Sequence, residues 1–245
     1  MSLTAAAAPL VEARSLSAGH GAMAVVHDLD LSVRAGEVAV LVGPNGAGKS
    51  TTLMTLVGAL KPLGGEVRVD GVRTTDPLHR RARAGLAFVP EQRSVVMELT
   101  TADNLRLARV ESAAAVELFP ELARLMGRKA GLLSGGEQQM LILARALARN
   151  PKVLIADELS LGLAPLVVQR LLDAVRRAAA ERGVGVLLVE QHVHLALRIA
   201  DRVHVMRRGR LTFTGTPADL QAHPTALDDA YFATNLVTPT AGPRS

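Results

Sequence analysis

The chain has 245 residues, of which 49% are hydrophobic and 21% charged, a composition typical of a globular domain with a sizeable core. It contains no cysteine, which excludes a disulfide framework and a cysteine-ligated metal site. The net charge of +5 would permit contact with nucleic acid, but arginines recur at helical spacing and indicate solvated helix faces, so we expect no nucleic-acid partner: Arg170, Arg176, Arg177 and Arg182.

No apolar run approaches the roughly 18–20 residues that span a bilayer. The segment Met1–Pro9 is rich in alanine and lacks the basic and long apolar regions of a signal peptide. We therefore expect a soluble, cytoplasmic protein whose role at a membrane would depend on a partner.

The first third of the chain alternates strand and helix patterns. An alternating strand is predicted over Val26–Val33, and a fully buried strand over Val38–Val42. Lys49–Leu60 has helical character and ends at a proline. Glu66–Asp70 is predicted as a strand after a Gly64-Gly65 turn, and Leu86–Val89 as another short strand.

The pattern from Thr100 to Asn150 is wholly helical and predicts an inserted helical lobe. Strand patterns then return, separated by one long helix that Gly183 ends. The remaining elements are expected at Val153–Ala156, Pro165–Arg182, Val184–Val189, a hairpin over Val203–Phe213 and a helix from Pro217, with disorder after Leu236. Buried strands alternating with helices predict an α/β core with a mainly parallel sheet.

A glycine-rich motif between the second strand and its helix predicts a phosphate site. The motif fits G-x-x-x-x-G-K-[ST], in which glycines let backbone N–H groups surround a diphosphate. Lys49 would place a charge on the β- and γ-phosphates, and Ser50 would offer a hydroxyl to Mg²⁺. The predicted nucleotide-binding residues here are Gly43, Pro44, Asn45, Gly46, Ala47, Gly48, Lys49, Ser50 and Thr51.

Two acidic residues follow the buried strand Val153–Ala156. Asp157 and Glu158 would stand at the carboxyl edge of the sheet, where open α/β sheets bind ligands. An Asp there can hold Mg²⁺ through its water shell, and a Glu can orient and deprotonate an attacking water. Glu158 is therefore the predicted catalytic base, and Asp157 a predicted Mg²⁺ ligand.

The run Leu133-Ser134-Gly135-Gly136-Glu137-Gln138-Gln139 opens a predicted helix. Ser134 with Glu137 three residues later forms a capping box, but two glycines in the first turn are poor helix formers. They make sense where bare N–H groups approach a phosphate closely.

This run resembles the signature motif of the ATP-binding-cassette (ABC) ATPases, and the resemblance extends over about Leu16–Phe232. It implies a P-loop NTPase (RecA-like) core, an N-terminal antiparallel β part and a helical subdomain. The domain would cover 10–237, with the core at about 10–90 and 151–237, the helical subdomain at about 91–150, and flexible tails at 1–9 and 238–245.

The same resemblance implies how ATP and Mg²⁺ are bound. Ser134, Gly135, Gly136 and Glu137 would contact the γ-phosphate held by a second ABC ATPase subunit, identical or related. His192 is similar to the switch histidine that reads this phosphate. His192 and His194 lack a third ligand at recognisable spacing, so a metal pair is not favoured. The loop Ser160–Leu163 resembles the one that crosses the dimer interface.

Further motifs resemble one branch, the shorter ATPase of bacterial branched-chain amino acid importers: Val89-Pro90-Glu91, Ser160 to Pro165, Val189 to His192, and Ala230-Tyr231-Phe232. This implies integral membrane permease subunits as partners, a solute-binding protein indirectly, and a location on the inner face of the cell membrane. Urea importers carry a close relative and stay an alternative.

The chain departs from the family at four places. His20 stands where an aromatic residue usually stacks on adenine, which predicts weaker nucleotide binding. Glu91 replaces the usual glutamine; either Glu91 or Gln92 would sense Mg²⁺, and Glu91 is favoured. Leu159 replaces a proline, and the stretch from Asn104 to Leu133 is about a dozen residues shorter than the branch usually has.

Related ATPases with other partners share the nucleotide motifs. A soluble ATPase of an iron–sulfur assembly complex would differ only in its partner and stays open. Chromosome and DNA-repair ATPases need a long coiled-coil insertion, for which Glu91 to Leu133 is too short. A phosphate-loop kinase or GTPase has no use for the signature motif.

Overall fold

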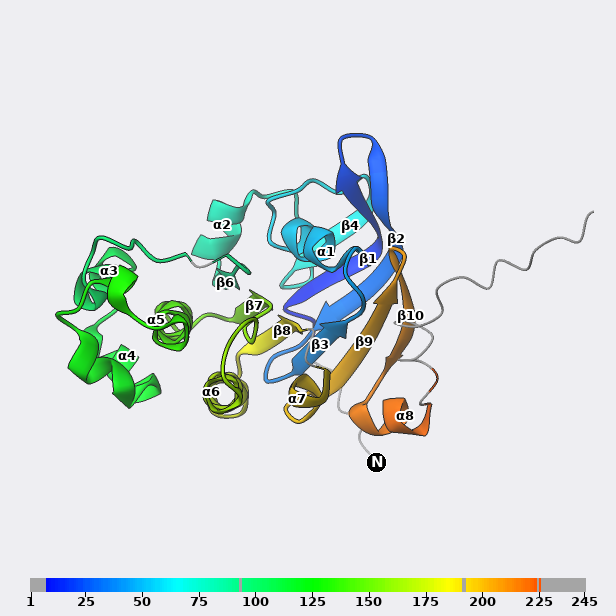
Figure 1. The fold of residues 1–245 in the computed structure, drawn as a ribbon. Coiled ribbons are helices and arrows are strands. Elements are labelled where there is room, and N and C mark those ends of the chain that lie inside the picture. The colour runs from blue at the N-terminus through cyan, green and yellow to red at the C-terminus, as the bar shows by residue number, and fades with distance from the viewer. Residues whose placement is uncertain (1–7, 93, 191–192, 224, 226–245) are drawn as a thin grey trace, which may run out of the picture.

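Two β-sheets form the core of the chain, and a lobe of helices extends from one side of them (Figure 1). The computed structural model describes residues 8–92, 94–190, 193–223 and 225. Within these residues, no helix is both long and apolar enough to cross a membrane.

The larger sheet has six strands in the order β10-β9-β3-β8-β7-β6. Its neighbours from β9 to β6 are parallel, and β10 joins β9 as an antiparallel hairpin. The three central strands are buried throughout, as their continuous apolar runs predict. The strands are β3 (Val38–Val42), β6 (Leu86–Val89), β7 (Val153–Asp157), β8 (Gly185–Val189), β9 (Arg202–Arg207) and β10 (Arg210–Gly215). The prediction of a mainly parallel sheet is confirmed.

The smaller sheet is antiparallel, in the order β2-β1-β4-β5, which confirms the antiparallel N-terminal part. Its strands are β1 (Val11–His20), β2 (Met23–Val33), β4 (Gly64–Val69) and β5 (Val72–Arg73). The prediction of a Gly64-Gly65 turn is wrong, since both residues belong to β4. A Cβ at Gly65 would lie 2.2 Å from the carbonyl oxygen of Ser15, so glycine allows β4 to pack against β1.

Helix α1 (Lys49–Leu56) lies between the sheets and contacts β1, β2 and β7. The predicted helix to Leu60 is wrong at its end, because Gly58 takes the left-handed conformation, with φ of 82°. Helix α6 (Pro165–Arg182) has the predicted bounds and ends at Gly183, whose φ is 68°. The shorter helices are α2 (Leu78–Arg83), α7 (Val193–Leu197) and α8 (Pro217–Ala222).

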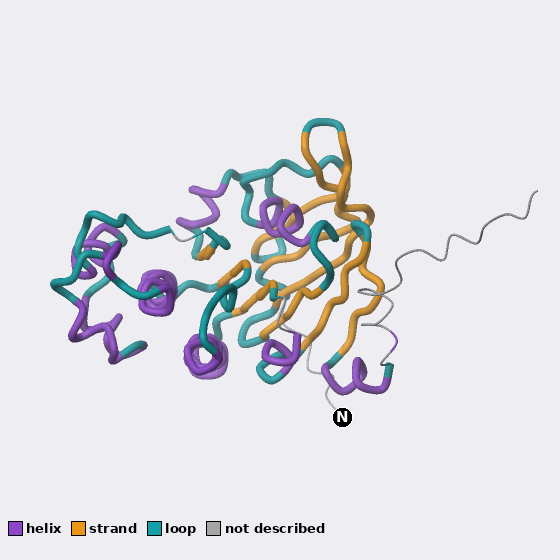
Figure 2. The backbone as a smooth tube through the Cα atoms, in the orientation of Figure 1, coloured by secondary structure: helices purple, strands orange, loops and turns teal. Residues whose placement is uncertain are grey.

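The lobe between β6 and β7 is helical, as predicted (Figure 2). It contains α3 (Thr101–Leu107), α4 (Ser112–Leu118), α5 (Gly135–Leu147) and two short 3₁₀ segments, Pro120–Leu125 and Ala130–Leu132. Helix α5 contacts both β6 and α6, and so joins the lobe to the larger sheet. The subdomain boundaries at 91 and 150 stay a prediction.

Candidate functional site

The glycine-rich loop lies between the buried end of β3 and the start of α1. Gly43 has a φ of 155°, and a Cβ there would lie only 2.2 Å from the carbonyl oxygen of Met206 on β9. The Gly209 N–H donates to the Ala47 carbonyl at 2.8 Å, so the β9–β10 turn also holds the loop. Contacts with β9 and with the β9–β10 turn therefore fix the conformation of the loop, so its backbone is preorganised to bind a ligand.

Lys49 is the first residue of α1 and is 5% exposed. Its ammonium group donates to the carbonyl oxygens of Gly43 at 2.7 Å and Pro44 at 3.0 Å, so the side chain folds back over the loop. Burial lowers the pKa of Lys49, and the charges of Glu158 and Asp157 oppose this shift. A cation is thus held beside the loop amides, where a phosphate would contact both.

Asp157 ends β7 and is buried. Burial raises its pKa most, a hydrogen bond from Ser50 lowers it, and the charges of Glu158 and Glu91 raise it further. Its Oδ1 is buried and has no hydrogen-bond partner among the described residues. A carboxylate oxygen left unsatisfied beside a serine hydroxyl suits a hard divalent cation, which would supply the missing charge.

Glu158 turns the chain sharply away from β7. It has a φ of 51°, and its N–H donates to the Val189 carbonyl of β8 at 2.9 Å. The next two residues are anchored: Leu159 is buried, and both the backbone N–H and the hydroxyl of Ser160 donate to the carboxylate of Glu190. Buried Glu190 therefore positions the loop that follows Glu158. We did not predict this role, because the contact joins residues 30 positions apart.

One hollow of about 340 Å³ brings together most of the predicted residues of this edge, but Asp157, Gly43, Pro44 and Ala47 are not among the residues that line it. It joins the phosphate loop to Glu91 and Glu158, which come from the ends of two other strands. Val25 of β2 was not predicted and also lies in its wall. The lining residues are Val25, Asn45, Gly46, Gly48, Lys49, Ser50, Thr51, Glu91 and Glu158.

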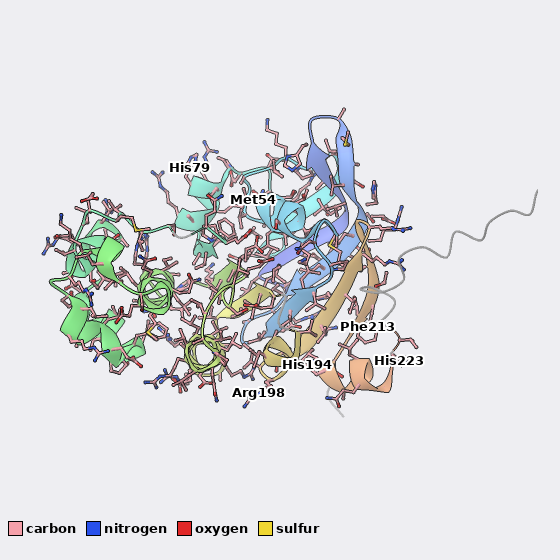
Figure 3. All side chains as sticks on the ribbon, in the orientation of Figure 1. Met54, His79, His194, Arg198, Phe213 and His223 are labelled. Carbon is pink, nitrogen blue, oxygen red and sulfur yellow. The ribbon has the colours of Figure 1, made fainter. Side chains whose placement is uncertain are left out.

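Two other predicted residues lie elsewhere. His20 ends β1, is exposed, and pairs with Met23 across the β1–β2 hairpin, outside the lining of the hollow. Gln92 is exposed and does not line the hollow either. His192 lies outside the described residues, and its neighbour His194 is exposed on α7 (Figure 3).

The signature run opens α5 in the helical lobe. The Ser134 hydroxyl accepts from the Glu137 N–H at 3.3 Å, and the Glu137 carboxylate accepts from the Ser134 N–H at 2.8 Å. These bonds confirm the predicted capping box. The N–H groups of Gly135 and Gly136 lie at the first turn, and the described residues provide no acceptor for them.

None of the residues from Ser134 to Glu137 lines the hollow at the phosphate loop. Gly136 also has a packing role that the sequence did not reveal. A Cβ at this position would lie 2.8 Å from Cγ1 of Val167 on α6. Glycine thus lets α5 approach α6 closely while its first turn stays bare.

A protein-family model described as ABC transporter matches residues 26–160 of this chain. The high-affinity branched-chain amino acid transport ATP-binding protein BraG of Pseudomonas aeruginosa is 40% identical, over 88% of this chain and 96% of that protein. The probable branched-chain amino acid transport ATP-binding protein LivF of Archaeoglobus fulgidus is 36% identical, over 85% and 92%. The lipopolysaccharide export system ATP-binding protein LptB of Escherichia coli is 33% identical, over 85% and 91%.

Two solved structures of ABC transporter subunits superpose on this chain. The ATP-binding subunit of an ABC transporter superposes with a TM-score of 0.77 at 31% identity, covering 89% of this chain and 94% of that one. A bacterial ABC transporter cassette solved as a dimer superposes with a TM-score of 0.76 at 25% identity, covering 84% and 98%.

Proposed function

This chain belongs to the ABC transporter family and is an ATP-binding ATPase, and from this premise we propose that it energises the import of branched-chain or other hydrophobic amino acids. Support for the solute class comes from BraG and LivF, which are more similar to this chain than LptB of Escherichia coli is, over comparable lengths. The sequence motifs that resemble the shorter ATPase of branched-chain amino acid importers support the same solute class.

The observation that carries the proposal is the hollow where Lys49, Glu91 and Glu158 meet the phosphate loop. Phosphates of ATP would accept hydrogen bonds from the loop amides and from Lys49, which offsets the charge on the leaving diphosphate. Glu158 lines the hollow and can accept a proton from the attacking water. Ser50, Asp157 and Glu91 would hold Mg²⁺, partly through water, and the bound ion would supply further positive charge.

Backbone donors that do not reach the hollow of their own chain support a dimer. Gly135 and Gly136 offer bare N–H groups at the start of α5, but they do not line the hollow of their own chain. In our proposal, two chains face each other and the signature run of one contacts the γ-phosphate on the loop of the other. His192 would also contact this phosphate. The dimer formed by a relative of similar fold supports this arrangement.

The helical lobe would contact the permease on the inner face of the membrane. A groove of about 550 Å³ lies between β6, α2 and the end of α5. Among the described residues, four basic side chains and no carboxylate line it, so it suits a segment with acidic or polar groups: His79, Arg83, Arg145 and Arg149. When the dimer opens, the helical lobe would move, and its contact with the permease would transmit this movement.

The Glu158→Gln variant tests this proposal. It should bind Mg-ATP and form a stable dimer, measured by light scattering after size exclusion, and should lose turnover. Lys49→Ala is the matched control and should lose nucleotide binding itself. A Glu158→Gln protein that still hydrolyses ATP, or that stays monomeric when saturated with Mg-ATP both alone and with its natural partner ATPase, would contradict the proposed site.

The solute and the partner need a separate experiment. The tagged chain should co-purify with integral membrane permease subunits in mild detergent. Reconstituted with them and their solute-binding protein, its ATPase activity should rise with leucine, isoleucine or valine and not with urea. Isolation with soluble iron–sulfur scaffold proteins instead would overturn the transport role and leave the ATPase site standing.

A further inference from the structure

A buried arginine, Arg81 of α2, holds the C-terminal end of the helix whose first turn carries Lys49 and Ser50. The guanidinium Nη1 donates to the carbonyl oxygens of Thr55 at 3.1 Å and Leu56 at 2.5 Å, and Nε donates to the carbonyl oxygen of Asp76 at 2.8 Å. Helix α1 has no basic residue of its own in its last turn. Arg81 therefore supplies from another element the cation that favours a helix C-terminus.

The surroundings of Arg81 are arranged for this contact. Its side chain is in the interior, 3% exposed, and burial lowers its pKa. The Asp76 carboxylate is paired with exposed Arg80 at 3.2 Å, so Arg81 is directed to backbone carbonyls. A Cβ at Gly58 would lie 2.7 Å from the Arg81 Nε, and glycine there leaves room for the guanidinium.

Helix α2 also forms one wall of the large groove. His79, Ala82 and Arg83 line it, whereas Arg81 points the other way, into the core. A second bond, from the Leu78 N–H to the Gly58 carbonyl at 3.1 Å, ties the start of α2 to the exit of α1. Figure 3 shows His79 on α2 and Met54 on α1 on the same side of the core.

We propose that Arg81 is a positioning residue, which fixes α1 relative to α2 and passes displacement of the groove wall to the phosphate loop. Helix α1 has eight residues, so about 12 Å separates the guanidinium end from the phosphate end. A helix this short moves as one body, so a shift at Thr55 and Leu56 also shifts Lys49 and Ser50. Without Arg81, the Leu56 carbonyl loses this donor and the Thr55 carbonyl keeps only the Gly58 N–H, at 3.1 Å, so the helix loses its fixed position.

Mg-ADP binding, measured by calorimetry, tests the positioning role without turnover. Arg81→Gln should weaken binding about tenfold, the size expected for one lost charge-assisted hydrogen bond. Arg81→Lys keeps the charge and should recover part of the affinity, while Arg80→Gln on the same helix should bind like the unmodified chain. Each protein is measured at a temperature where circular dichroism shows it fully folded, which separates positioning from lost stability.

Several results would overturn the positioning role. Affinity of Arg81→Gln equal to that of the unmodified chain is one, and equal weakening by Arg80→Gln is another. If Arg81→Gln does not fold, affinity of Arg81→Lys equal to that of the unmodified chain decides against it. The inference rests on the proposed nucleotide site, but different results refute the two. If the unmodified chain does not bind Mg-ADP, the nucleotide site itself is refuted, whereas the results above refute only the positioning role of Arg81.

The link to the groove is tested with a single thiol, since the chain has no cysteine. His79→Cys modified with a bulky maleimide should change the KM for ATP when Arg81 is present, and much less in the Arg81→Gln protein. Arg149→Cys, on the opposite wall, is the matched control, and its label should act equally in both backgrounds. A label at position 79 that has no effect, or the same effect with and without Arg81, would contradict the link.

Discussion

Gly136 has two explanations, and a pair of substitutions separates them. One is packing, because a Cβ at this position would lie 2.8 Å from Cγ1 and 3.2 Å from Cγ2 of Val167. The other is function, because bare N–H groups at the start of α5 can approach a phosphate. Gly136→Ala alone disturbs both, and adding Val167→Ala removes the steric conflict only.

The expected loss of stability follows from these distances. Ordinary carbon contacts are about 3.5–4.0 Å, so α5 and α6 must separate by several tenths of an ångström, and the branched Val167 side chain has little freedom to turn away. Overpacking of this kind costs about 1–3 kcal/mol, and replacing glycine by alanine in a helix regains about 0.5–1 kcal/mol. Gly136→Ala should therefore lower the free energy of unfolding by about 0–2.5 kcal/mol.

Urea unfolding and steady-state ATP hydrolysis measure the two effects separately. The Gly136→Ala/Val167→Ala protein should be at least as stable as Val167→Ala alone, and by up to about 1 kcal/mol more stable, because the steric conflict is gone and the helix-propensity gain of alanine remains. Its ATPase activity should stay at least about tenfold below that of Val167→Ala, because the added methyl group still covers the N–H groups. If activity returns together with stability, Gly136 serves packing alone and the phosphate role of the signature run is refuted.

Two further changes test the buried imidazole of β9 and the hairpin beside the nucleotide site. Burial lowers the pKa of His204 to about 4, whereas the unfolded imidazole takes up its proton near pH 6.5, so stability should fall by up to about 3 kcal/mol as the pH drops through this window. His204→Asn should flatten this dependence in urea titrations at pH 7.5 and 5, and an unchanged slope would assign it to other groups. His20→Tyr should strengthen Mg-ADP binding to the monomer by up to about tenfold, since base stacking on an aromatic ring is worth about 1–3 kcal/mol. Unchanged or lower affinity, measured by calorimetry, would refute the stacking role of position 20.

Local patterns predicted the parts of the fold that local forces determine. The strands β3 and β6 and the helix α6 have the predicted bounds, because apolar runs, a proline start and a glycine stop all act within a few residues. Strand β1 was missed, because register shifts after Ala13 and Leu16 break its alternation. The early end of α1 was missed, although Gly58 is a local glycine stop like Gly183; only the hydrogen bonds from the distant Arg81 could not be predicted from the sequence.

The residues of the candidate site fall into the same two groups, those that local sequence patterns predict and those that they do not. The loop residues proposed to carry the phosphate chemistry are contiguous, so their spacing alone identifies them as candidates. Val25 in the wall of the hollow, Glu190 behind Ser160 and Val167 against Gly136 act across the fold, and no sequence spacing indicates them. Sequence spacing therefore indicates candidate groups for contact with ATP, whereas the residues that hold those groups in place are found only in the structure.

The two glycine-opened helices have their ends arranged in complementary ways. In α1 the carbonyls of Thr55 and Leu56 accept hydrogen bonds from Arg81, while the N-terminal turn faces the hollow with Lys49. In α5 the capping box satisfies the N–H groups of Ser134 and Glu137 and leaves those of Gly135 and Gly136 available. In the proposed dimer, the α- and β-phosphates of a nucleotide would satisfy the first helix within one chain, and the terminal phosphate would satisfy the second from a facing chain. On this account ADP, which lacks that phosphate, should bind one chain without joining two, and the dimer should depend on ATP.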